Sequence, residues 1–158
     1  MTAAAPELAS KLRLEGGKLA AFLEGISAEG WHRTVYTEGT VWTVRSVLAH
    51  LVTAERGFLV QLFPNVREGK GGASADFSID RYNARQQEKT RDLVPSELLV
   101  EFRLIRSRMA DWVAGLSEAD LETVGRHPYL GETTLREMVK MVYLHNQIHY
   151  RDVRKALE

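Results

Sequence analysis

The chain contains 158 residues, of which 44% are hydrophobic and 27% charged, a composition typical of a globular protein. This length fits one domain with a sizeable core, so we expect residues 1–158 to form a single domain. The 21 basic and 21 acidic residues balance, which argues against a nucleic-acid-binding function. Because the chain has no cysteine, disulfides, cysteine-ligated zinc and a cysteine nucleophile are excluded.

The sequence carries no sign of export or of membrane insertion. Residues 1–6 lack both the basic and the apolar region of a secretory signal. Apolar runs stay well short of the roughly 20 residues that cross a membrane. We therefore expect a cytoplasmic protein without a membrane partner.

The first half of the chain predicts two long helices. Apolar residues at helical spacing indicate one helix over about Pro6 to Glu24, which Gly16-Gly17 weakens. Thr43 is suited to cap a second helix, which runs to about Phe63 and is stopped by Pro64. Between them, Thr34 to Val41 is β-branched and aromatic. Because one short hairpin is marginal by itself, we expect an irregular connection there.

The second half predicts two more long helices and a shorter polar one. The polar helix runs over about 79–92, with Ser78 or Asp80 as its cap. An apolar stripe predicts a helix from Pro95 to about Gly115. After a loop that holds Gly125, His127, Pro128 and Gly131, the capping-box pattern Thr134-Leu135-Arg136-Glu137 marks the start of the last helix. A bundle is the natural solution for these elements, because each long helix has one apolar stripe to bury, and we predict an all-α fold.

The last helix carries the most informative spacing in the chain. His145 and His149 are four residues apart, so both imidazoles lie on one face of the helix, one turn apart. His50 lies next to the apolar stripe of the second helix. Three such nitrogens could hold one ion at about 2.0–2.1 Å and leave coordination positions open, as in catalytic sites. Imidazole ligands suit zinc, nickel, copper or iron(II).

An alternative interpretation is that these are ordinary hydrogen-bonded histidines, because a pair at this spacing also arises by chance. We interpret the two remaining histidines, His32 and His127, as structural or surface groups. Glu55 points well away from His50 along the helix, so we expect it to be exposed. Three arginines of the predicted helix from Pro95 to about Gly115 are expected on its solvated face: Arg103, Arg106 and Arg108.

Several stretches resemble the DinB-like (DinB/YfiT-like) family of metal-binding four-helix bundles. The resemblance rests on residues 42–51 (WTVRSVLAHL) and 145–149 (HNQIH). Shorter matching stretches lie between them in the same order: residues 80–83, 95–99, 102–106 and 127–131. The likeness thus covers nearly the whole chain.

The resemblance implies a bundle with a long crossover connection, often dimeric, that holds a divalent metal on His50, His145 and His149. We expect zinc or nickel, with iron as a further candidate, and a homodimer. The wider superfamily includes thiol-dependent transferases and maleylpyruvate isomerases that use mycothiol, bacillithiol or glutathione. Our leading hypothesis is therefore a metal-dependent enzyme that acts on a small-molecule substrate with an exogenous thiol, as an S-transferase or isomerase.

Two other functions remain open at this point. A hydrolase that activates water is a variant of the same site. The competing class is a non-catalytic dimeric bundle that binds a small ligand and whose metal is structural or absent. No catalytic acid or base is assigned, and Glu55 and Asn83 are only secondary candidates.

Overall fold

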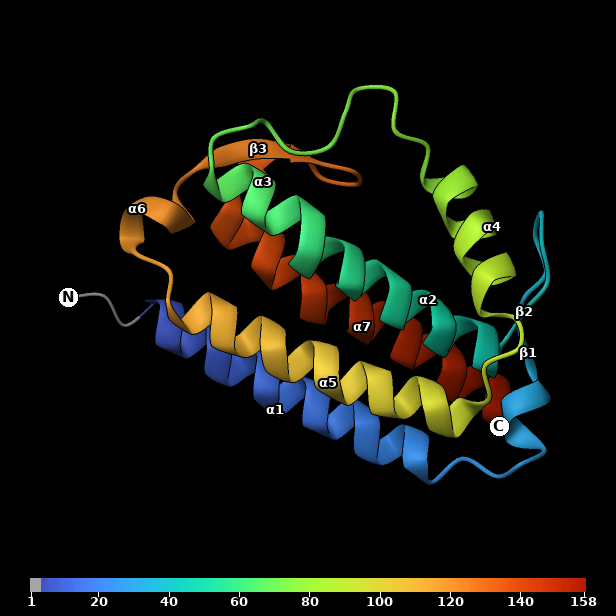
Figure 1. Cartoon of the computed structure of the whole chain (residues 1–158). Coiled ribbons are helices and arrows are strands. Elements are labelled where there is room, and N and C mark those ends of the chain that lie inside the picture. Colours follow the sequence, from blue (N-terminus) through green and yellow to red (C-terminus); the bar gives the residue numbers. More distant parts are fainter. Residues whose placement is uncertain (1–3) are drawn as a thin grey trace.

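The computed structural model describes residues 4–158 and is mainly helical (Figure 1). Four long helices lie side by side: α1 (Ala4–Glu24), α2 (Val44–Gly57), α5 (Pro95–Ala114) and α7 (Leu135–Leu157). Helix α1 packs along α5, and α2 contacts both α5 and α7. The predicted all-α four-helix bundle is confirmed. Within residues 4–158, no helix has the length and hydropathy needed to span a membrane.

The connection from the second to the third bundle helix is the long crossover. It runs over residues 68–94 and includes α4 (Ile79–Thr90), which packs against α2 (Figure 1). The Ser78 side chain accepts a hydrogen bond from the backbone N–H of Arg81, which confirms it as the cap of α4. Thr43 and Thr134 cap α2 and α7 in the same way. The crossover thus lies over the α2 side of the bundle.

Helix α2 does not stop at Pro64. A π-helical turn (Phe58–Leu62) follows it directly, and α3 (Phe63–Arg67) continues with Pro64 in its first turn. The prediction was wrong because proline is tolerated where its missing N–H is not needed. The backbone N–H of Phe63 here bonds to the carbonyl of Phe58 across the wider turn.

Two short hairpins stand where the sequence predicted an irregular connection, over Thr34 to Val41, and a loop that holds Gly125 to Gly131. Strand β1 (Thr34–Tyr36) pairs with β2 (Trp42–Thr43), and β3 (Val124–His127) pairs with β4 (Gly131–Thr134), both antiparallel. A hairpin that is marginal alone gains stability when it packs on helices. The β1–β2 hairpin contacts α2 and α7, and β3–β4 contacts α3 and α7. Two brief helical turns complete the chain, η1 (Gly30–His32) and α6 (Glu118–Leu121).

A buried polar cluster lies inside the bundle and corrects two expectations. Arg106 and Glu55, expected on the surface, have side chains only 4% and 1% exposed. The guanidinium donates from Nε and Nη2 to the two Glu55 oxygens at 3.0 and 2.7 Å, from Nη2 to Asn146 Oδ1, and from Nη1 to the Leu12 carbonyl. Asn146 Nδ2 also donates to Glu55. The cluster joins α1, α2, α5 and α7.

The two adjacent glycines of α1 should respond in opposite ways to replacement by alanine. Either change raises helix propensity by about 1 kcal/mol. A Cβ at Gly17 meets nothing within 4 Å, whereas a Cβ at Gly16 would lie 2.7 Å from Cγ and Nη1 of the fixed Arg106 side chain. We expect Gly17→Ala to raise the free energy of unfolding by about 0.5–1 kcal/mol and Gly16→Ala to lower it by about 1–3 kcal/mol. Urea unfolding measures both, and equal stabilisation would contradict the packing described here.

Candidate metal centre and its pocket

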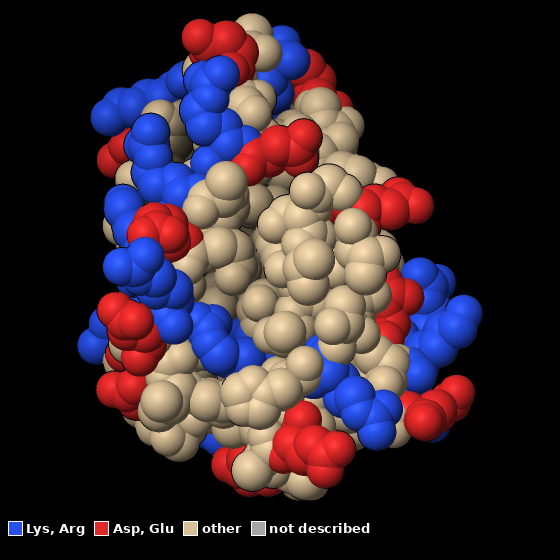
Figure 2. Space-filling view, turned by 90° about the vertical axis from the view of Figure 1, so that its right-hand side faces the viewer, with Lys and Arg blue, Asp and Glu red and all other residues tan. Residues whose placement is uncertain are grey.

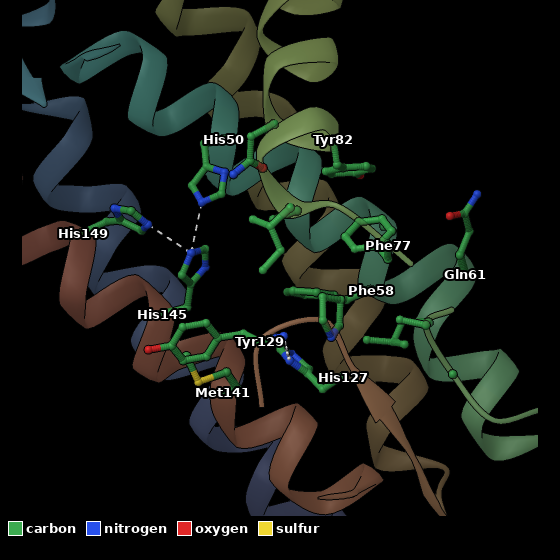
Figure 3. Close-up of a pocket in the computed structure, with 18 of the residues that line it drawn as sticks. His50, Phe58, Gln61, Phe77, Tyr82, His127, Tyr129, Met141, His145 and His149 are labelled. Carbon is green, nitrogen blue, oxygen red and sulfur yellow. Dashed lines mark hydrogen bonds between the residues drawn. The ribbon is translucent and has the colours of Figure 1, made fainter. Parts of the chain in front are cut away.

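Three histidines from two helices meet at one point. His50 is on α2, and His145 and His149 are on α7. The Nε2 atom of His145 lies 3.0 Å from the Nε2 atoms of both His50 and His149 (Figure 3). One nitrogen from each ring can be chosen so that all lie within 4.8 Å of one another. The structure therefore brings together the three residues that the sequence singled out.

A tyrosine and an aspartate outside the cluster orient His149. The Tyr36 hydroxyl donates to Asp152 Oδ2 at 2.5 Å and lies 2.9 Å from His149 Nδ1. Because its single proton goes to Asp152, Tyr36 can only accept from an Nδ1–H of His149. The Nε2 atom of His149 then carries a lone pair that faces the other two rings. Such partners commonly fix the tautomer of a histidine that binds metal.

Burial keeps the three rings uncharged. Burial, and then the charges of the other two histidines, lower the pKa of His50 to about 2. Burial and His145 lower the pKa of His149 to about 3. Burial also lowers the pKa of His145, against the opposing influence of Glu55. A histidine must be neutral to bind a metal, so the cluster is in the required state at neutral pH.

The cluster has the donor set and spacing of a metal site. Nitrogens bound tetrahedrally at 2.0–2.1 Å stand about 3.3 Å apart, close to the 3.0 Å between Nε2 of His145 and Nε2 of each of the other two histidines. Three neutral imidazoles suit zinc, nickel, copper or iron(II) and leave at least one coordination position for another ligand. The residues present therefore fit a divalent ion.

The three histidines form part of the wall of a pocket of about 520 Å³. This volume is in the range of small-molecule sites. Its walls come from α2, the π-helical turn, the crossover, the β3–β4 turn and α7. None of the described residues that line it is Asp, Glu, Lys or Arg. Five lining residues are exposed at the surface, so the pocket opens to solvent: Gln61, Phe77, Ile79, Tyr129 and Ile148.

The face of the molecule on the side of α4 and the β1–β2 hairpin is, like the pocket, largely free of charge at its centre (Figure 2). Figure 2 shows a broad uncharged area in the middle of this face, bordered by charged side chains. Large exposed apolar residues of the crossover include Phe77 and Ile79, which are 40% and 38% exposed and also line the pocket. The surroundings of the pocket therefore favour an apolar ligand over a charged one.

The other residues considered from the sequence fall in different places. Asn83 lines the pocket beside His50 and favours protonation of that ring. His127, expected to be structural or on the surface, is 3% exposed and also lines the pocket. His32 is exposed, as are Arg103 and Arg108. Glu55 does not line the pocket, and its carboxylate is bonded to Arg106 and Asn146.

Tyr36 and Asp152 are neighbours of the cluster that the sequence analysis did not identify. Asp152 follows His149 by three residues, so helical spacing alone would place it one turn away. Tyr36 comes from a segment 113 residues away, and only the hairpin fold carries its hydroxyl to the cluster. Asn146 is the residue after His145 and could have been noticed as a polar residue on an apolar helix face.

Fold and site together define a helical bundle with a three-histidine cluster open to an apolar pocket. The chain belongs to the DinB superfamily, whose sequence model matches residues 11–153. It is 25% identical over 145 residues to the uncharacterized protein YuaE of Bacillus subtilis (strain 168), and the match covers 86% of this chain and 88% of YuaE.

A solved structure shows the same fold. YfiT from Bacillus subtilis, described as a probable metal-dependent hydrolase with an unusual four-helix bundle topology, matches with a TM-score of 0.75. The match covers 96% of this chain and 85% of YfiT, at 18% sequence identity. The similarity to YfiT supports the bundle with its long crossover.

The metal-free protein should lose stability as the pH falls from about 7.5 to about 5.5. An unfolded histidine takes up a proton below about pH 6.5, whereas folded His50 and His149 stay neutral. The unfolded state then binds more protons, so the free energy of unfolding falls with pH, by about 1 kcal/mol for each of the two residues. Urea unfolding of chelator-treated protein at both pH values measures this loss.

A matched pair of variants tests the assignment to the cluster. His50→Gln removes one titrating ring and should reduce the loss by about 1 kcal/mol. His32→Gln changes an exposed histidine and should leave the loss as in the wild type. An undiminished loss in His50→Gln would show that His50 takes up its proton without unfolding.

Proposed function

We propose that this protein is a divalent-metal-dependent enzyme of small-molecule thiol chemistry, an S-transferase or isomerase that uses a thiol from solution. The observation that carries the proposal is the position of His50, His145 and His149 in the wall of an open, uncharged pocket. Membership of the DinB superfamily supports the metal-binding part of the proposal. The three Nε2 atoms would hold the ion, with zinc or nickel as the expected metals.

A divalent ion at this position would act as a Lewis acid and lower the pKa of a coordinated thiol or water. The chain supplies the remaining conditions. Tyr36 and Asp152 hold the proton of His149 on Nδ1, and the apolar walls keep water away from a bound substrate. The chain has no cysteine of its own, so the thiol must come from a cosubstrate.

The surroundings favour a thiol over water as the nucleophile. Unless the ion itself ionises the water beforehand, attack by water requires a base to remove a proton during the reaction. Among the described residues the buried carboxylate is Glu55, which is already paired with Arg106, and no carboxylate lines the described pocket. A thiol is much more acidic than water and can lose its proton to solvent before the reaction. A thiolate then attacks without a base in the pocket.

Hydrolysis is the second candidate, favoured by the structural similarity to YfiT, which is described as a probable metal-dependent hydrolase. The two candidates share the same three histidines. They differ in whether sulfur or oxygen is the nucleophile, and a spectroscopic test can separate them.

Loss of one histidine should abolish most metal binding. We expect protein purified without an affinity tag to contain close to one zinc or nickel ion per chain. His145→Ala and His149→Ala should lose most of it, because two nitrogens hold the ion much more weakly than three. Both variants should keep their helix content, since alanine is the better helix former. Elemental analysis measures the metal and circular dichroism the helix, with His32→Ala as the control.

The thiol hypothesis can be tested with cobalt(II) in place of the native ion. Addition of 2-mercaptoethanol should produce a thiolate-to-cobalt charge-transfer absorption in the wild type but not in His145→Ala. A wild-type protein that binds cobalt but shows no such band would refute thiol chemistry. Hydrolysis of a simple phenyl ester by that same protein would then support the hydrolase.

A further inference from the structure

His127 is a further histidine in the wall of the pocket, separate from the three-histidine cluster. It lies at the end of β3, is 3% exposed, and lines the same cavity. Its ring lies beside Phe58, with the ring centroids 5.6 Å apart, and near Tyr129 (Figure 3). Nothing in the proposed metal site requires a histidine at this position.

The hydrogen bonds of His127 determine its tautomer. Its Nδ1 atom accepts from the backbone N–H groups of Tyr129 at 3.0 Å and Leu130 at 3.1 Å. A nitrogen that accepts two hydrogen bonds carries a lone pair, so in the neutral ring the proton is on Nε2. Burial, the main cause, and the charge of His145 lower the pKa of His127 to about 4, so the ring is neutral at pH 7.

The Nε2–H group is a donor in need of an acceptor. It is buried and has no hydrogen-bond partner among residues 4–158. A buried donor without a partner costs about 1–3 kcal/mol, so such groups usually have a reason to persist. Glu55, the buried carboxylate of the described residues, does not meet this need, because it is bonded to Arg106 and Asn146.

We propose that Nε2–H of His127 donates a hydrogen bond to a carbonyl oxygen of the ligand and thereby selects uncharged, largely apolar carbonyl compounds. This inference deepens the proposed function, since it concerns the substrate of the same pocket. A neutral donor suits a neutral acceptor, whereas a buried carboxylate would call for a cationic partner. No Lys or Arg lines the described pocket, and its walls include Phe58, Met141 and Ile148.

A purely structural role for His127 must be separated from this recognition role. The two bonds to Nδ1 tie down the turn between β3 and β4, and that role needs only an acceptor. His127→Asn keeps an acceptor close to the Nδ1 position, in its Oδ1 atom, and removes Nε2. The variant should therefore keep the turn and lose the donor, and its melting temperature should stay close to that of the wild type.

The first experiment reads the tautomer directly. Long-range 1H–15N NMR of the wild type at pH 7 should show His127 with its proton on Nε2 and an unprotonated Nδ1. A proton on Nδ1, or a charged ring, would overturn the inference.

The second experiment compares two probes of similar shape, acetophenone and ethylbenzene, by NMR titration. His127→Asn should weaken acetophenone binding about fivefold, the value of one neutral hydrogen bond, and leave ethylbenzene binding within about twofold. His32→Asn, a change at an exposed site, should affect neither. Equal effects on both probes, no effect on acetophenone, or no binding of acetophenone to the wild type would each overturn the proposal.

The titrations are run on protein as purified and again after removal of metal with a chelator. The selective loss of acetophenone should appear in both samples, because the donor belongs to His127. A selective loss in protein that never contains metal would reject the proposed metal enzyme and leave the carbonyl site standing. Metal binding without the selective loss of acetophenone binding would support the metal site and reject the carbonyl site.

Discussion

The buried pair of Arg106 and Glu55 is the interaction on which the arrangement of this bundle depends. It separates two apolar clusters, one with Leu12, Met109 and Val142 and the other with Leu51 and Ile105. A buried ion pair is tolerated only when its remaining hydrogen bonds are satisfied. Here the Leu12 carbonyl and the Asn146 amide satisfy them. Sliding any bundle helix along its axis would break one of these bonds, so we infer that the pair fixes the register of all four helices.

This register extends directly to the histidine cluster. Asn146 bonds to the buried pair, and the preceding residue on the same helix turn is His145. The position of α7 that satisfies Asn146 therefore also sets the direction of His145. Glu55 in turn stands five residues after His50 on α2. The charge pair thus positions both helices of the cluster without contributing a side chain to the pocket, which keeps the pocket uncharged.

The sequence predicted local helical features well, and contacts between distant segments poorly. The spacing of His145 and His149 and the capping residues Thr43 and Thr134 are local signals, and the structure follows them. Glu55 was misplaced because it was judged by its distance from His50. It follows the buried Leu51 by four residues, so its place on the core face could be seen from the sequence. The two hairpins could not be predicted from the sequence, since their pairing depends on helices that are distant along the chain.

The cluster and the rest of the pocket come from different kinds of structure. His50, His145 and His149 project from regular bundle helices, which hold them rigidly. The facing walls come from segments outside the regular bundle helices: the π-helical turn, the crossover with its helix α4, and the β3–β4 hairpin. Such segments tolerate changes of length and sequence far better than a packed helix. A protein of this design can therefore change the ligand that its pocket accepts by altering the crossover or the β3–β4 hairpin that holds His127, while its three histidines and the buried pair behind them stay in place.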